Sequence, residues 1–203
     1  MGGLVRGVTS IMPNELNART EEEARLQDLM RRYQAGQLDA FERLYTELSP
    51  GLGQYLTSLA RDSARRSDLL QDTFLQIHRS RHTYDPALPV RPWAFAVARH
   101  VWLMSERSRR RRNVHEAPAE VDLPDLPVPP EIEGWVSRDH LGRALGHVTS
   151  DRREALMLHH LFGLSFREIG ALLGIREGAA KIRASRGMAE LRQVLAHQGG
   201  VHA

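Results

Sequence analysis

The side chains whose types and spacing suggest chemistry gather in residues 165–195, where cations recur on one side of a predicted helix. Apolar residues recur three or four positions apart in each half of this stretch, which indicates two helices. Gly174 stands between the halves, where a left-handed helix stop is expected. Lys181, Arg183 and Arg186 fall outside the apolar stripe of the second half. Such cations can hydrogen-bond phosphates and base edges, so the pattern predicts a DNA-binding helix-turn-helix.

A purely structural helical hairpin is the alternative reading of the same stretch. Any hairpin on a soluble protein shows a similar apolar stripe, and arginine is common on solvated helix faces. Gly170 has no side chain where the second helix must cross closely, which fits both interpretations. Spacing alone leaves both open, and the rest of the chain has to decide between them.

Composition limits the classes to which the chain can belong. Its 203 residues allow one or two domains, and its 41% hydrophobic content is ordinary for a globular protein. The absence of cysteine excludes disulfides and thiolate zinc sites. No apolar run reaches the length of a membrane span, and the first residues lack a signal-peptide core. We expect a soluble, cytoplasmic protein that does not insert into a membrane.

The ten histidines raise the alternative of an enzyme, such as a nuclease or a metal hydrolase. His78 and His82 stand four apart and can share a helix face, but no Glu or third His completes the metalloprotease pattern. His159 and His160 are adjacent, so on a helix they point in different directions. The sequence therefore predicts no catalytic residue, no metal site and no cofactor.

Apolar residues recur at helical spacing in two long segments, 21–112 and 135–196, and no strand pattern or internal repeat stands out. The first helix is expected to begin near Glu21, and residues 49–51 (Ser-Pro-Gly) are expected to interrupt or kink a later one. The predicted fold is all-α, with two small helical domains joined by an acidic, proline-rich linker. The predicted boundaries are a disordered leader at 1–20, a helical domain at 21–112, the linker at 113–134, a second helical domain at 135–196 and a tail at 197–203.

Charge alternates along the chain in an informative way. Residues 91–112 combine aromatic and Arg side chains, the linker holds six acidic residues with no Lys or Arg, and the helix-turn-helix is basic again. Unpaired bases stack on aromatic rings while cations bind phosphates, so this segment suits single-stranded nucleic acid. The alternative is that Trp93, Phe95 and Trp102 are core residues. The loop at 82–92 beside this segment suits a flipped base.

Four sequence blocks follow one another between about Leu26 and Leu195: AFERLY, DLLQDTFLQIHRSRHTYDP, RPWAFAVARHV and LSFREIGALLGIREGAAKIRASRGMAELR. In order and spacing these blocks resemble a known family, the bacterial extracytoplasmic-function sigma factors. The resemblance implies an initiation factor, not an enzyme, with sigma region two at 21–112 and sigma region four at 135–196. The implied partners are core RNA polymerase (its largest-subunit coiled coil and its flap), promoter DNA and an anti-sigma factor. The linker is implied to thread toward the active-site and RNA-exit channel; the alternative is a merely solvated tether.

The resemblance also implies roles for individual residues. The helix at 68–79 is the implied polymerase-docking helix, with the polar candidates Asp68, Gln71, Asp72, Thr73 and Gln76. The implied contacts to the minus-ten element are Arg91, Trp93, Arg99 and His100. The implied contacts to the minus-thirty-five element are Arg176, Lys181, Ile182, Arg183, Ser185 and Arg186.

Three residues depart from the family pattern. His100 stands where Asn is usual, which puts the sequence preference at the minus-ten element in doubt. Ala180 removes the usual β-branched packing residue, and Ile182 stands where a small polar residue is frequent. Ile182 suits contact with a thymine methyl or with a partner protein, and the sequence does not decide between them.

Two further alternatives follow from the same residues. A stand-alone helix-turn-helix regulator predicts a ligand pocket or a phosphoacceptor domain in the first half, where the sequence instead indicates a helical domain with an aromatic, basic helix. An adaptor that binds polymerase but not DNA would keep its activity without residues 135–203, whereas a sigma factor would lose promoter selection.

Overall fold

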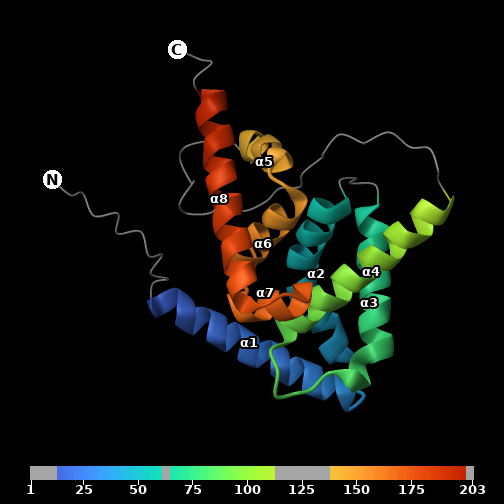
Figure 1. The fold of residues 1–203 in the computed structure, drawn as a ribbon. Coiled ribbons are helices and arrows are strands. Elements are labelled where there is room, and N and C mark those ends of the chain that lie inside the picture. The colour runs from blue at the N-terminus through green and yellow to red at the C-terminus, as the bar shows by residue number, and fades with distance from the viewer. Residues whose placement is uncertain (1–12, 61–64, 113–137, 200–203) are drawn as a thin grey trace.

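The computed structural model describes residues 13–60, 65–112 and 138–199, which form helices joined by short connections (Figure 1). Within these ranges there is no β-strand, which confirms the predicted all-α class. None of the helices in the described part is long and apolar enough to cross a membrane. The elements are α1 (Pro13–Gln34), α2 (Leu38–Ala60), α3 (Arg66–Ser80), the 3-10 helix η1 (Arg81–Thr83), α4 (Val90–Arg112), α5 (Arg138–His147), α6 (Ser150–His160), α7 (Phe166–Leu173) and α8 (Glu177–Gly199).

Helices α1 to α4 form the amino-terminal group and pack around apolar side chains that recur at helical spacing. Leu26, Met30 and Tyr33 of α1 meet Leu44 and Leu52 of α2 in this core, and each is at most 2% exposed. Burial of one stripe per helix removes apolar surface from water, which is the main term that favours this packing.

The start of α1 differs from the prediction. The helix begins at Pro13 rather than near Glu21, so residues 13–20 belong to a helix and not to a disordered leader. Proline is well tolerated at the first helical position, because its missing N–H has no intrahelical acceptor there. The predicted tail at 197–203 differs at its start, because α8 continues to Gly199 and so includes residues 197–199. Residues 1–12, the predicted linker at 113–134 and residues 200–203 lie outside the described residues.

Helix α2 also differs, since it continues through Pro50 without an interruption. Leu48 before the proline and Leu52 after it are both buried, 5% and 0% exposed. The apolar stripe is therefore continuous across the proline, and its packing outweighs the loss of one backbone hydrogen bond.

Helices α7 and α8 form the predicted helix-turn-helix. Ser165 caps α7 in a reciprocal capping box with Glu168, and Gly174 ends it with a φ of +69°. A Cβ on Gly170 would lie 2.8 Å from the carbonyl oxygen of Ile175, so only glycine permits this close approach of the turn. These contacts explain the sharp reversal between α7 and α8.

The carboxy-terminal group α5 to α8 packs against the amino-terminal group, and the buried residues of both form one continuous cluster. In Figure 1, α7 lies between α8 and α4, and its residues contact α4. The ring of Phe162, in the α6–α7 connection, lies 5.0 Å from that of Phe95 and 5.9 Å from that of Tyr55. The two helical groups therefore share an aromatic contact.

Candidate nucleic-acid interface

Helix α8 separates a core face from a polar face in its first half. Ala180, Ala184 and Met188 are buried at 0%, 1% and 6% exposure. The exposed residues around them include five of the six predicted DNA contacts: Arg176, Lys181, Ile182, Ser185 and Arg186. Lys181, Ile182, Ser185 and Arg186 thus lie exposed on α8, the second helix of the helix-turn-helix, and Arg176 lies exposed just before its first residue. In a helix-turn-helix this is the helix that can enter a DNA groove.

Arg183, the sixth predicted contact, is only half-exposed. Its Nη1 lies 3.5 Å from Oδ2 of Asp151, in the first turn of α6. An ion pair this open to solvent is weak, about 0–1 kcal/mol, so it orients Arg183 without removing it from reach of a ligand.

The two unusual residues of this helix have different surroundings. Ala180 is fully buried and fills the core stripe directly, so the missing β-branched side chain leaves no exposed gap at that position. Ile182 is 53% exposed and stands between Lys181 and Arg183 on the outward surface. An exposed apolar side chain at this position suits either a thymine methyl in the major groove or a partner protein.

Helix α4 holds the four predicted minus-ten contacts, and they differ in how available they are. His100 is exposed, whereas Trp93 is half-buried with its ring 5.2 Å from that of Tyr84. Arg91 pairs with Glu22 of α1, and Arg99 Nε donates to Glu154 Oε1 of α6 at 2.9 Å. Both arginines therefore already bind carboxylates from other helices in this arrangement.

The aromatic residues of α4 differ in how deeply they are buried. Phe95 is 3% exposed and belongs to the core. Trp93 and Trp102 are half-buried and pack against that core. The indole nitrogen of Trp102 is buried without a hydrogen-bond partner.

Helix α3 presents most of the predicted docking residues outward. Asp68, Gln71 and Asp72 are exposed, and Gln76 is half-exposed. Thr73 differs from the prediction, because it is fully buried and its hydroxyl donates to the Leu69 carbonyl oxygen at 2.7 Å. Its polar group is therefore satisfied inside its own helix and does not face a partner.

Sequence reasoning missed an apolar residue on that same face of α3. Leu75 is 44% exposed, and it stands four positions after Gln71 and three after Asp72. Tyr45 of α2 is 45% exposed and its ring lies 4.4 Å from that of Phe74. The sequence does contain a signal for Leu75: it stands four positions after Gln71, and residues four apart share a helix face.

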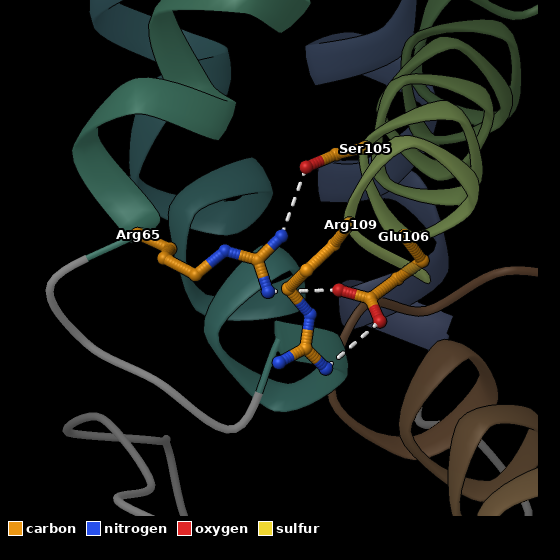
Figure 2. Close-up of polar contacts among 4 residues, drawn as sticks. All are labelled: Arg65, Ser105, Glu106 and Arg109. Atoms are coloured by element: carbon orange, nitrogen blue, oxygen red, sulfur yellow. Dashed lines mark hydrogen bonds and ion pairs between the residues drawn. The ribbon is translucent and has the colours of Figure 1, made fainter. Parts of the chain in front are cut away.

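A cluster of charged side chains fixes the start of α3 against the end of α4 (Figure 2). Arg65 donates to Glu106 Oε1 at 2.8 Å and to Ser105 Oγ at 2.8 Å. Arg109 Nη2 approaches the other oxygen of Glu106 at 3.3 Å. Burial acts to raise the pKa of Glu106, but the hydrogen bond from Arg65 and the charge of Arg109 outweigh it and lower that pKa below its usual value.

Glu154 of α6 connects the two helical groups. The hydroxyl of Tyr55 donates to Glu154 Oε1 at 2.7 Å, and the same oxygen accepts from Arg99. Tyr55 is fully buried, and its burial, with the charge of Glu154 beside it, raises its pKa well above the usual value. The carboxylate thus satisfies a buried hydroxyl and a predicted DNA contact at once.

The described residues were also compared with the requirements of a metal site. Within these ranges no three His, Asp or Glu side chains converge as a metal site. The arrangement instead offers two basic, outward surfaces on α4 and α8, and a mixed polar and apolar surface on α3.

Two family models match the chain over separate segments. Residues 44–112 match the family described as Sigma-70 region 2, and residues 138–191 match the family described as Sigma-70, region 4. The first match covers most of α2 to α4 and the second covers α5 to the middle of α8.

Characterised relatives match over nearly their full length. The chain is 37% identical over 166 residues to the RNA polymerase sigma factor CarQ of Myxococcus xanthus, covering 82% of this chain and 95% of that protein. It is 31% identical over 157 residues to the ECF RNA polymerase sigma factor SigL of Mycobacterium tuberculosis, covering 77% of this chain and 89% of that protein.

Solved structures share the fold. The sigma factor RpoE from Bartonella quintana, in complex with the anti-sigma factor NepR, aligns with a TM-score of 0.65 at 23% identity, covering 77% of this chain and 96% of that one. CnrH, in complex with the cytosolic domain of CnrY, aligns with a TM-score of 0.63 at 21% identity, covering 85% and 98%.

Proposed function

The chain belongs to the extracytoplasmic-function group of sigma-70-type RNA polymerase sigma factors, and from that membership we propose how its surfaces divide the work of initiation. As a sigma factor it is a DNA-binding initiation factor that recruits core RNA polymerase to promoters. We propose that it acts in the cytoplasm, that it catalyses no reaction itself, and that an anti-sigma factor holds it inactive until a signal arrives.

The outward surface of α8 is proposed to read the minus-thirty-five element. The observation that carries the proposal is the group of exposed residues on α8, Lys181, Ile182, Ser185 and Arg186, in the second helix of a capped helix-turn-helix. Arg183 is proposed to join them, and Arg176 to bind a phosphate near the start of α8. Guanidinium groups suit guanine edges and phosphates in the major groove.

The outward surface of α4, with the loop before it, is proposed to bind the minus-ten element. His100 is exposed and available for stacking or hydrogen bonding. Arg91, Trp93 and Arg99 are proposed to join it, and Arg99 must first leave Glu154. Unpaired bases held by aromatic and Arg side chains fit this combination.

The exposed face of α3 is proposed to dock on the largest-subunit coiled coil of the polymerase. Asp68, Gln71, Asp72 and Gln76 supply the polar contacts, and Leu75 supplies an apolar one. Thr73 is left out, because its side chain is buried. A polar rim around an exposed apolar side chain is a common composition of protein interfaces.

The two helical units are proposed to keep the boundaries expected from the sequence, 21–112 and 135–196, with residues 13–20 added to the first as helix. The acidic segment at 113–134 is proposed as the tether between them, and the polymerase flap as the partner of the second unit. Of the two solved structures described above, RpoE is in complex with the anti-sigma factor NepR and CnrH is in complex with the cytosolic domain of CnrY. The first of these complexes supports an antagonist for this chain.

The proposal is tested by run-off transcription with core polymerase on genomic promoter fragments. A sigma factor yields promoter-specific transcripts that disappear when residues 135–203 are deleted. The second candidate, a stand-alone helix-turn-helix regulator, predicts duplex binding without core polymerase and no effect of substitutions on α3. Core binding without any promoter-specific transcript would exclude the initiation role.

A further inference from the structure

The connection between α3 and α4 makes its contacts with the rest of the protein mainly through main-chain atoms, while most of its side chains face solvent. From His82 to Leu88 every side chain except that of Tyr84 is exposed, and Leu88 is 55% exposed. Tyr84 is 3% exposed and packs against Trp93. Tyr84 is therefore the one residue from His82 to Leu88 whose side chain points inward, and the other side chains are open to solvent.

Helix α1 supplies the contacts that hold this backbone. Gln34 Nε2 donates to the carbonyl oxygens of Arg81 at 2.7 Å and of Tyr84 at 3.0 Å. Gln27 Nε2 donates to the carbonyl oxygen of Leu88 at 3.0 Å. At the far end, the carboxylate of Glu23 accepts from the backbone N–H of Val90. These four contacts run the length of the connection.

The three α1 residues form a single stripe. Glu23, Gln27 and Gln34 are spaced by four and seven positions, which places them on one helix face. Contacts inside the connection complete the arrangement, because the Tyr84 hydroxyl donates to the Leu88 carbonyl oxygen and the Ala87 N–H donates to Asp85 Oδ1 at 2.9 Å. The main chain at 81–90 is thus tied to α1 at both ends.

Contacts directed at a backbone fix its path without using the side chains of the loop. A loop that reads an unpaired base must hold its groups in place before the base arrives, since ordering it on binding would cost affinity. Single-stranded bases are recognised by side chains and main-chain groups on their exposed edges. A backbone held from behind with outward side chains meets both requirements.

We propose that Glu23, Gln27 and Gln34 are positioning residues that preorganise the connection at 81–90 for recognition of an unpaired minus-ten base. The inference rests on the proposed function of α4 and its preceding loop, and it extends the specificity apparatus to a helix that touches no DNA in that proposal. The residues act through the main chain of the loop, so they set base preference without contacting the base.

The test uses holoenzyme reconstituted from core polymerase and the full chain, with single-stranded oligonucleotides carrying each base in turn across the promoter's minus-ten segment. The variants are Gln34→Ala, the double substitution Gln27→Ala with Gln34→Ala, and Gln34→Glu, which keeps the size of the side chain but removes its amide donor. Gln37→Ala is the matched control, because Gln37 bonds Arg32 in the α1–α2 turn and not the loop.

The expected result is a loss of base preference with core binding unchanged. The ratio of affinities for the best and worst base falls about five- to tenfold in the double variant, as the loss of a few hydrogen bonds allows. Amide hydrogen exchange at 81–90 rises in the same variants, and the Gln37→Ala protein behaves like wild type. Gln34→Glu follows Gln34→Ala rather than wild type.

Two results would overturn the inference. If every variant keeps the base preference of the wild-type protein, the connection at 81–90 does not need the contacts from α1. If the variants lose affinity equally for every oligonucleotide and keep the preference, the α1 residues have only a general stabilising role. The proposed function fails separately: in that case the wild-type holoenzyme itself shows no preference for any base.

Discussion

An exposed cation on α8, Arg186, allows a test of DNA recognition by a single residue. Arg186 lies on the outward surface and, unlike Arg183, has no ion pair to Asp151 to exchange. If it reads a base edge, Arg186→Ala weakens binding to the preferred promoter by about 1–3 kcal/mol and relaxes preference at one position. Holoenzyme binding to a promoter library measures both effects.

Arg192→Ala provides the matched control, because it removes the same charge from an exposed position further along α8. It is expected to leave base preference unchanged. If Arg186→Ala instead weakens binding equally for all sequences and lowers the salt dependence, Arg186 contacts phosphate and does not read a base.

The glycine at the crossing of α7 and the turn predicts a local stability effect. Gly170→Ala places a methyl group 2.8 Å from the Ile175 carbonyl oxygen and 3.2 Å from the Glu177 nitrogen, and both are backbone atoms. The change is expected to destabilise the protein by about 1–3 kcal/mol, as measured by urea unfolding.

Gly178→Ala is the control for that measurement. A Cβ at Gly178 meets no atom within 4 Å, and the position is helical. Alanine there is expected to stabilise the protein by about 0.5–1 kcal/mol through its better helix propensity. Equal effects of the two substitutions would show that the turn yields to the added methyl group.

At the residue scale, sequence periodicity places Lys181 and Arg186 outside the apolar stripe of α8, where the structure exposes them, but it does not find contacts between distant residues. Arg99 and Glu154 are 55 positions apart, and no spacing rule connects them. The family resemblance implies Thr73 as a polar docking residue, yet a threonine hydroxyl can donate to the carbonyl oxygen four residues back and be buried, as it is here. Leu75 was overlooked because apolar side chains are expected inside.

At the scale of elements, the relation of α3 to α4 depends on the charged cluster around Glu106. These helices are proposed to bind polymerase and the minus-ten strand, so their mutual orientation couples the two contacts. The side chain of Glu106 in α4 is 16% exposed. It pairs with Arg65, just before α3, and with Arg109, one turn further along α4. The contribution of this cluster to the free energy of unfolding can be measured separately.

A pH series tests this cluster through Glu106. Because its pKa is lowered in the folded protein, the carboxylate contributes stability that is fully present above the usual value of 4.5 and is lost as pH falls through the folded pKa. Glu106→Gln is expected to lower the unfolding free energy by about 0.5–1.5 kcal/mol at neutral pH. The difference from wild type should disappear in acid.

Glu42→Gln is the control for the pH series, because Glu42 is exposed on α2. Its difference from wild type is expected to be near zero at all pH values. A Glu106→Gln difference that persists unchanged in acid would show that the ionised carboxylate is not what joins α3 to α4.

Element types were more predictable than element ends. The apolar stripes and the capping signals at Ser165 and Gly174 determine the helix-turn-helix locally, so the sequence was sufficient there. The start of α1 at Pro13 was missed because residues 13–20 carry little apolar periodicity. The continuity of α2 through Pro50 depends on packing against other helices, which local propensity does not contain.

At the scale of the whole molecule, the two helical groups are in contact and yet are proposed to bind different promoter elements. Phe162 packs against Tyr55 and Phe95, and Glu154 holds Arg99. At about 3.3–3.6 Å per residue, the segment at 113–134 would span roughly 73–79 Å if fully extended. Such a length would let the groups separate while remaining one chain, and separation would release Arg99 from Glu154.

Substitution of Glu154 tests whether this contact restrains the chain. Glu154→Ala removes the partner of both Arg99 and the buried Tyr55 hydroxyl, and an unsatisfied buried hydroxyl costs about 1–3 kcal/mol, which favours separation of the groups. The radius of gyration of the free protein, measured by small-angle X-ray scattering, is expected to rise. Affinity for single-stranded minus-ten DNA, measured with holoenzyme at limiting sigma factor, should rise with it if Arg99 binds the strand.

Tyr55→Phe separates the two parts of this contact, since it removes the hydroxyl but leaves Arg99 paired with Glu154. It is expected to change both measurements less than Glu154→Ala does. Unchanged scattering with Glu154→Ala would show that the aromatic contact of Phe162 alone keeps the groups together. A larger radius without tighter strand binding would show that release of Arg99 is not what limits contact with the minus-ten strand.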